Sequence, residues 1–241
     1  MMKDSAFRGF PPAAISFFRG LRRNNDRDWF QARKEIYESS VKAPMAELVD
    51  AVNRELADWA PQYVTDAKKA VYRIYRDTRF SPNKTPYKDH AAAIFTRRGL
   101  EKHAAASLYF SVSDKEIEIA GGVYMPGPEQ LLAIRTHIAR HHPEFRRLIA
   151  ARNLQRLMGE MKGDRLSRVP KGFPADHPAA DLVRHKQWLY YVLLKPGVAT
   201  TPRLIAELVR RFQSMLPFVE FLNSPLVAHA RRRDLSRDLL G

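Results

Sequence analysis

Apolar residues recur at helical spacing along the first sixty residues, and polar breaks divide them into three predicted helices. The first helix buries one face and stops at the polar run 24–26. A second helix is predicted from an N-cap at Asn25 or Asp26 to about residues 39–40, and a third over residues 44–59. Pro44 suits the first turn of that third helix.

From residue 71 the apolar pattern changes towards a period of two, which is typical of strands. The segments with this pattern are 71–75, 91–96, 107–112 and 116–123. A short polar turn at 113–115 predicts an antiparallel hairpin between the last two. The pair Gly121-Gly122 indicates a bulge or a close approach of two backbones.

Helical spacing returns in the second half of the chain. A helix is predicted from Pro128 to about residues 141–143, a buried strand over 188–194, and a last long helix from about Pro202 to near Pro217. Helices at both ends of a run of strands, without alternation of strand and helix, predict an α+β fold with an antiparallel sheet flanked by helices. We expect a single domain over residues 1–241, with a charged tail at 226–241 that frays.

Composition narrows the class of protein. With 45% apolar and 10% aromatic residues, the chain can bury a core, which excludes a disordered or collagen-like chain. The lack of Cys excludes disulfides, thiolate metal sites and cysteine nucleophiles. The longest apolar run, 188–194, is far shorter than the roughly 20 residues of a membrane-spanning helix, and the first residues lack the pattern of a signal peptide. We therefore expect a cytoplasmic protein that does not cross a membrane.

The net charge of +15 is concentrated in two stretches. Residues 70–102 hold eight basic and three acidic side chains, and residues 134–172 hold ten basic and three acidic ones. A basic surface attracts phosphorylated ligands and nucleic acid. A general abundance of Arg that reflects base composition of the genome would give the same charge without any ligand.

The densest basic segment places five cations within residues 73–88. In an extended chain Arg73, Asp77 and Arg79 share one side, so that the carboxylate can orient both guanidinium groups towards an anion. Arg76 lies on the opposite side, near Phe80. Alternatively, these residues form only a surface ion-pair network on an edge strand.

The segment 81–84 reads as a turn, because Ser and Pro occupy its first two positions. That turn would bring Lys84, Tyr87 and Lys88 back towards the arginines. The same place would then hold a mobile positive charge and a phenol.

Seven positions of this segment form a pattern that resembles the signature of a widespread bacterial family of conserved hypothetical proteins, a domain of unknown function. They are Arg73, Arg76, Asp77, Arg79, Phe80, Lys84 and Tyr87. The resemblance extends over roughly residues 7–225, including 24–30, 121–124 and 170–173. It implies a single-domain bacterial protein in which these residues share a role, and it supplies no activity.

Other candidate chemistry is sparser. Lys171 and the pair Asp176-His177 lie in a predicted loop, where His177 could handle a proton or simply belong to a turn. His185, just before the predicted strand 188–194, reaches the same cleft or faces water. The spacing of His137 and His141 fits two ligands of one metal, but no third ligand is evident, so we expect no metal site. Phosphate-loop, dinucleotide and nucleophile-elbow strings are absent.

These observations favour a site for a small phosphorylated or carboxylated anion, and they leave open whether a reaction follows. The expected ligand-binding residues are Arg73, Arg76, Arg79, Lys84 and Lys171; Asp77 and Phe80 have orienting roles, and Tyr87, His177 and Asp77 are the candidates for proton transfer. The sequence identifies no cofactor. The alternative is a nucleic-acid-binding module that adds the basic stretch 135–171 and uses Tyr72, Tyr75 or Phe80 for stacking. A plain interaction protein is the third reading.

Overall fold

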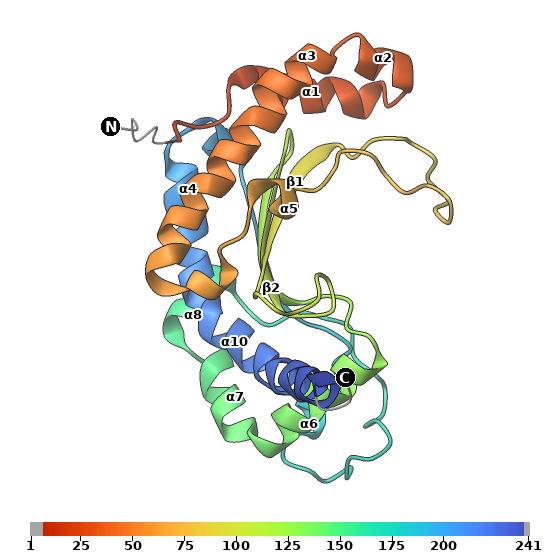
Figure 1. The fold of residues 1–241 in the computed structure, drawn as a ribbon, viewed down its shortest axis with the longest axis vertical. Helices are drawn as coiled ribbons and strands as arrows, with labels where there is room; N and C mark the ends of the chain where they lie inside the picture. The colour runs from red at the N-terminus through yellow and green to blue at the C-terminus, as the bar shows by residue number, and fades with distance from the viewer. Residues whose placement is uncertain (1–6, 239–241) are drawn as a thin grey trace. The chain divides into compact units, whose positions relative to one another are not determined.

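The computed structural model describes residues 7–238, with side chains up to residue 230 except at 229. Helices precede and follow a four-stranded antiparallel sheet whose strands pair in the order β1-β2-β3-β4 (Figure 1). The strands are β1 (His90–Thr96), β2 (Ser107–Ser113), β3 (Ile117–Val123) and β4 (Trp188–Leu194). The predicted α+β class is confirmed. The predicted charged tail, 226–241, lies mostly beyond the described side chains, and residues 239–241 lie outside the described residues.

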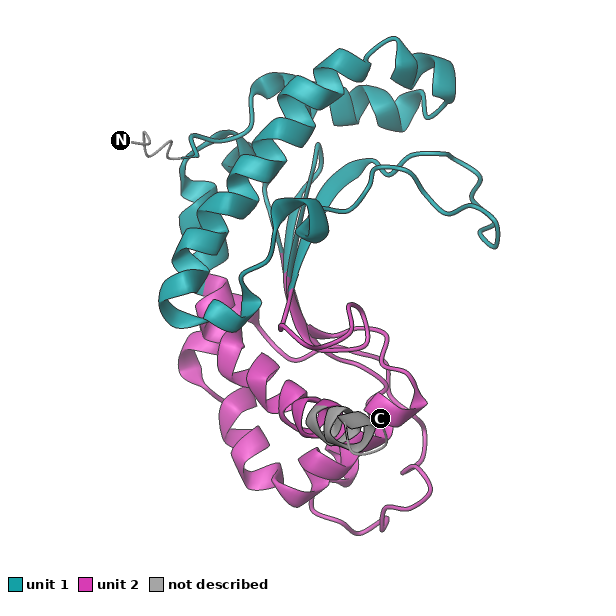
Figure 2. Ribbon diagram, viewed as in Figure 1, with its two compact units in different colours: residues 1–95, 109–119, 193–210 teal, residues 96–108, 120–192, 211–241 magenta. Residues whose placement is uncertain are grey.

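The chain divides into two compact units, each built from three segments (Figure 2). Unit 1 comprises residues 1–95, 109–119 and 193–210, described from residue 7 onward. Unit 2 comprises residues 96–108, 120–192 and 211–241, described up to residue 238. Each unit contains part of every strand of the sheet.

The N-terminal helices of unit 1 begin largely where the sequence places them. These elements are α1 (Pro12–Arg23), α2 (Arg27–Gln31), α3 (Lys34–Ile36), the π-helix η1 (Tyr37–Lys42) and α4 (Ala43–Trp59). Asp26 is the N-cap of α2, since its side chain accepts a 2.8 Å hydrogen bond from the backbone N–H of Trp29. The predicted helix end at residues 39–40 is wrong, because η1 leads directly into α4. The Ser39 hydroxyl donates to the Glu35 carbonyl at 2.7 Å and is thus satisfied inside the helix.

Shorter elements complete unit 1. They are the 3-10 turns η2 (Pro61–Tyr63) and η3 (Pro196–Thr200), the single turn α5 (Ala67–Ala70) and the start of α10 (Arg203–Asp238). The core of this unit is rich in aromatic rings, with Phe17 in edge contact with Phe18 and Phe30 at centroid distances of 5.9 and 6.1 Å.

Unit 2 packs α10 against shorter helices and the sheet. The shorter helices are α6 (Pro128–Arg140), α7 (His142–Ile149), α8 (Arg152–Met158) and α9 (Ala180–Val183). Phe145 of α7 and Tyr190 of β4 both contact Phe218 of α10, with ring centroids 5.8 and 5.0 Å apart. No helix in the described residues is long and apolar enough to cross a membrane.

Two expectations for this half of the chain are wrong. The last helix does not end near Pro217 but continues through it to Asp238. Pro217 lies on the exposed side, where water can hydrate the carbonyl that its missing N–H leaves unpaired, while the neighbouring Phe218 is fully buried. Strand β4 is not buried throughout: it alternates, with Trp188 buried and Leu193 53% exposed, because one face of the antiparallel sheet is covered.

The expected close approach at the paired glycines is confirmed at Gly122. Its φ of +127° lies in the region that favours glycine, and a Cβ there would lie 2.1 Å from the carbonyl oxygen of Trp188. Gly122 therefore allows β3 and β4 to approach each other within unit 2.

Candidate anion site in unit 1

The basic segment forms two arms joined by a loop rather than a regular strand. The predicted strand 71–75 is wrong, because only isolated antiparallel bridges form, Val71 with Ala93 and Tyr75 with Tyr87. Backbone hydrogen bonds of 2.9 Å from Arg76 N–H to the Pro86 carbonyl and 2.8 Å from Lys88 N–H to the Ile74 carbonyl hold the arms together. The loop 76–86 extends away from the strands (Figure 1). The predicted return of Tyr87 and Lys88 towards the arginine segment is thus confirmed.

The returning arm is anchored to the N-terminal helices through Asn25 and Phe30. The Asn25 amide donates to the Tyr87 carbonyl and accepts from the Tyr87 N–H, both at 3.0 Å. The Tyr87 ring stacks on Phe30 with centroids 4.2 Å apart and planes 14° apart. Together these contacts fix the position of Tyr87, which is 2% exposed.

A pocket of about 220 Å³ lies where this anchored arm meets the end of α1 and the start of β1. Its lining holds three permanent cations, one carboxylate and one imidazole. The lining residues are Arg22, Asn25, Arg76, Asn83, Thr85, Tyr87, Lys88, Asp89 and His90. The excess of positive charge in so small a space favours an anionic ligand.

Arg76 is the part of the sequence motif that supplies a guanidinium to this pocket. Its Nη1 donates to the Thr85 hydroxyl at 2.8 Å, and that hydroxyl in turn donates to Asn83 Oδ1 at 2.8 Å. These two contacts hold the guanidinium in one orientation. Among the described residues this is its only side-chain hydrogen bond, so the guanidinium retains other N–H donors for a ligand.

The other charged groups of the pocket have protein partners. Arg22 pairs with Asp114, and the Lys88 ammonium donates to the Arg73 carbonyl at 3.0 Å and lies 4.9 Å from the centre of the Tyr72 ring. Imidazole Nδ1 of His90 lies 3.3 Å from Asp89. This contact with His90 is the main reason why the pKa of the Asp89 carboxyl lies below its usual value. Asp89 therefore remains ionised and neutralises part of the positive charge.

Tyr87 is suited to donate a proton or a hydrogen bond rather than to act as a base. Burial, followed by the neighbouring Tyr75, raises the pKa of its phenol above the ordinary value of 10. The hydroxyl therefore stays protonated at neutral pH.

Most of the other predicted site residues in the segment face solvent outside the pocket. Asp77 does not bridge two arginines but accepts a bidentate pair from Arg79 alone, at 3.0 and 2.8 Å. These hydrogen bonds lower the pKa of Asp77 to about 2. Phe80 is 92% exposed, and the Arg79 guanidinium lies 5.7 Å from the centre of its ring, so the contact of Phe80 with the predicted site residues is with Arg79. Lys84 donates to the Thr78 carbonyl at 2.9 Å. Arg73 is also exposed.

Lys171 and His177 belong to unit 2 and are absent from the lining of the unit 1 pocket. Nδ1 of His177 accepts a 3.0 Å hydrogen bond from the Ala179 N–H, which is the turn-forming role that the sequence left open. Lys171 is exposed at the surface of its loop.

The basic stretch 135–171 is not uniformly available to phosphates. Arg135 is 8% exposed and donates to the His185 carbonyl at 2.9 Å, and Arg146 pairs with Asp181 at 2.7 Å. No group of three or more metal-ligating side chains occurs in the described part of the chain.

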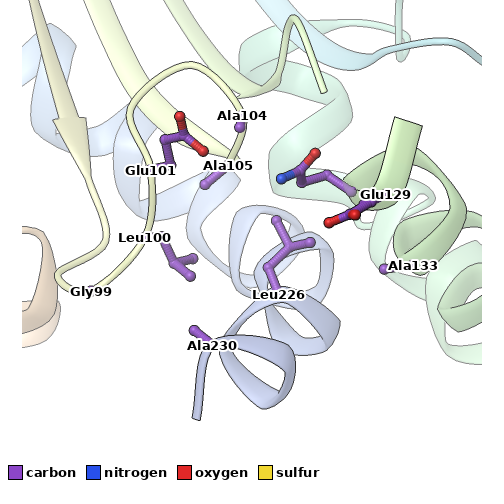
Figure 3. Close-up of a pocket in the computed structure, with 10 residues that line it drawn as sticks. Gly99, Leu100, Glu101, Ala104, Ala105, Glu129, Ala133, Leu226 and Ala230 are labelled. Carbon is purple, nitrogen blue, oxygen red and sulfur yellow. The ribbon is translucent and has the colours of Figure 1, made fainter. Parts of the chain in front are cut away.

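Unit 2 has a separate acidic hollow of about 270 Å³ (Figure 3). Glu101 from the loop after β1 and Glu129 from the first turn of α6 contribute carboxylates, while Leu226 of α10 forms part of the apolar wall. Its charge is the wrong sign for an anion.

Sequence reasoning missed Arg22, Asn25 and His90 as pocket residues. Asn25 and Tyr87 are separated by 62 positions, so no local pattern connects them. The only signal for Asn25 in the sequence was that the segment 24–30 belongs to the family resemblance, which gave no reason to place it next to Tyr87.

Comparison with known families gives one match. A family model described as conserved hypothetical protein (DUF2461) matches residues 13–221. No curated protein and no solved structure matches the chain.

Proposed function

Since the chain belongs to the DUF2461 family of conserved hypothetical proteins, whose description names no activity, we propose its function from the unit 1 pocket: it binds a small phosphorylated or carboxylated anion there. One observation carries this proposal. Arg22, Arg76 and Lys88 line a single pocket of about 220 Å³ in which Asp89 is the one carboxylate.

Arg76 is the central anion-binding residue in this proposal. Its guanidinium is oriented by Thr85 and retains N–H donors, and the planar arrangement of those donors matches two oxygens of a phosphate or carboxylate. Lys88 is held by the Arg73 carbonyl and contributes a fixed positive charge. Asp114 offsets the charge of Arg22, whose remaining N–H groups can still donate to a ligand.

Tyr87 is the proton donor of the pocket if the bound anion reacts. Its raised pKa keeps the phenol protonated, and its stacking on Phe30 holds it in place. Asp77 is a poor base at neutral pH because its pKa is about 2. Lys171 and His177 have no part in the proposed unit 1 site.

The test is calorimetric titration with inorganic phosphate, pyrophosphate and citrate, on the wild type, Arg76→Ala and the matched control Arg79→Ala. Arg79 lies in the same loop but is exposed and paired with Asp77. A charge-assisted hydrogen bond is worth about 1.5–3 kcal/mol, so Arg76→Ala should weaken binding by about tenfold or more, while Arg79→Ala keeps wild-type affinity. Equal losses in both variants, or no binding by the wild type, would contradict the proposal.

Nucleic-acid binding is the second candidate, and the loop tip favours it. Phe80 is 92% and Tyr75 48% exposed, next to the exposed side chains of Arg73, Arg79 and Lys84. Exposed rings that stack on bases, among cations that contact phosphates, are typical of surfaces for single strands.

Binding of a labelled single-stranded oligonucleotide at several salt concentrations tests this candidate. Three phosphate contacts predict a slope of about −2 in the plot of log affinity against log salt concentration. Phe80→Ala should weaken binding of the oligonucleotide, and Arg76→Ala should not. A salt-independent affinity, or an unchanged affinity in Phe80→Ala, argues against the loop as a nucleic-acid surface.

A further inference from the structure

A second pocket, of about 630 Å³, lies within unit 2. We propose that it binds a free α-amino acid with an apolar side chain, through opposite charges at the two ends of the zwitterion and an apolar wall between them. This site is independent of the anion site in unit 1.

The pocket wall depends on an extended segment that pairs with the chain leading into β4. Isolated antiparallel bridges join Lys162 to Leu189 and Arg165 to His185. Gly163 permits this approach, because its φ is +130° and a Cβ there would lie 2.3 Å from the Gln187 carbonyl oxygen. The pairing brings the backbones of Arg165 and His185 next to each other, and both residues line the pocket.

His185 presents an acceptor nitrogen to a ligand. The side chain is buried, with 1% of the residue exposed, and its Nδ1 lies 3.2 Å from the Gln187 carbonyl oxygen. A carbonyl can only accept, so Nδ1 carries the hydrogen and Nε2 carries the lone pair. Among the described residues Nε2 has no hydrogen-bond partner. A ring nitrogen that can only accept and has no protein partner favours a ligand with an N–H donor.

The imidazole is also neutral at physiological pH. Burial, and next the positive charge of Arg165, lower the pKa of His185 to about 4. A neutral ring can accept a hydrogen bond from an ammonium group without the repulsion that an imidazolium would exert.

The charges of the pocket divide into one satisfied pair and two groups without a protein partner. Arg146 donates to Asp181 at 2.7 Å and to the Pro178 carbonyl at 2.7 Å. The charges of Arg146 and Asp181 therefore offset each other within the protein. The Arg165 guanidinium and the Glu160 carboxylate are exposed and make no ion pair with the described residues. One remaining cation and one remaining anion match the carboxylate and the ammonium of a zwitterion.

Gln155 and Tyr190 also line the pocket, and the polar group of each donates to the Ile149 carbonyl. The other residues of the lining are apolar. Ile149, Ala150, Met161 and Leu182 contribute to the wall, and the volume is within the usual range for small-ligand sites. An apolar side chain on the amino acid would cover these groups, whereas a second charge on the ligand would meet no partner.

Titration calorimetry with L-leucine, L-methionine and L-phenylalanine tests the proposal on the full chain. The matched probes are 4-methylpentanoate, which lacks the ammonium group of leucine, and 3-methylbutylamine, which lacks its carboxylate. At least one amino acid should bind in a saturable way, and each probe should bind about tenfold or more weakly, since each loses one charge-assisted contact. Equal affinity for leucine and either probe, or no saturable binding by any of the three amino acids, would overturn the proposal.

Arg165→Ala identifies the site, with Arg168→Ala as the matched control, because Arg168 is exposed in the same segment and does not line the pocket. Arg165→Ala should weaken amino-acid binding by about tenfold or more and Arg168→Ala should not. Nitrogen NMR of His185 gives a second readout: the Nε2 resonance should move on binding while Nδ1 keeps its hydrogen. An unmoved Nε2 resonance, or equal losses in the two variants, places the amino acid elsewhere and refutes the site.

Discussion

Asn223→Ala and Asn25→Ala each remove two hydrogen bonds between a side-chain amide and the backbone of one residue, but in different surroundings. Asn223 donates to the Ala106 carbonyl at 2.8 Å and accepts from the Ala106 N–H at 2.9 Å. Asn25 makes the equivalent pair with Tyr87, at 3.0 Å for each bond. Asn223 and Ala106 are fully buried, whereas Asn25 is half-buried and lines, together with the 2% exposed Tyr87, a pocket that gives water access to the freed groups. The two variants therefore differ in whether water can replace the lost amide.

The expected costs follow from that difference. Where water can reach the freed backbone groups, two neutral hydrogen bonds cost about 1 kcal/mol each, so Asn25→Ala should lower the free energy of unfolding by about 2 kcal/mol. Where water cannot, each buried and unpaired group costs about 1–3 kcal/mol. Asn223→Ala leaves two such groups on Ala106, so it should cost about 4 kcal/mol.

Urea unfolding followed by circular dichroism measures these free energies, and amide hydrogen exchange locates them. Exchange at the Ala106 N–H should accelerate in Asn223→Ala, and exchange at the Tyr87 N–H in Asn25→Ala. The control is Asn24→Ala, which removes an exposed 3.1 Å hydrogen bond to the Gly20 carbonyl and should change stability by less than about 0.5 kcal/mol. If Asn223→Ala and Asn25→Ala lower the free energy of unfolding equally, the argument from water access is refuted.

Two further predictions concern the sheet. Gly122→Ala should destabilise the fold by more than about 3 kcal/mol in urea unfolding, because its Cβ would collide with the Trp188 carbonyl; Gly172→Ala, also at positive φ (+94°) but with no atom within 4 Å, should cost only about 1 kcal/mol. Burial raises the pKa of both Tyr72 and Tyr109 to about 12, so the folded state holds these protons more tightly than the unfolded state. The contribution of these two tyrosines to stability should be constant below pH 10 and be lost between pH 10 and 12. Titration of phenolate absorbance tests this, and ionisation of all tyrosines near pH 10 in the folded protein would contradict it.

The helices and the strands of the central hairpin were predictable because their apolar periods are local properties of the chain. The sequence predicted too early an end for helix α10, because the cost of Pro217 to a helix is visible in the local sequence. The burial of Phe218 offsets that cost, but it depends on contacts with elements distant in the sequence. Strand β4 looked buried because seven apolar residues follow one another, yet an antiparallel sheet with one covered face leaves Leu193 exposed.

Of the candidate site, Arg76 and Tyr87 were predictable from the sequence, whereas Asp77 orients Arg79 alone and not both Arg73 and Arg79. Alternation along the extended arm was visible in the sequence, and Arg73 and Asp77 do share exposure on one side while Ile74 is buried on the other. The pocket itself forms only when Tyr87 pairs with an asparagine 62 positions away, which no local pattern encodes.

The alternation gives the basic motif two chemically different sides. Arg76 is held by Thr85 inside a pocket, where desolvation strengthens a contact to one small anion. Arg79 lies on the exposed loop, where its pair with Asp77 is screened by water and salt. Binding that depends on Arg76 and resists salt therefore reports a pocket ligand, whereas binding that depends on Arg79 and falls with salt reports a surface ligand. The same two substitutions, measured at two salt concentrations, thus separate the two functions that the motif could serve.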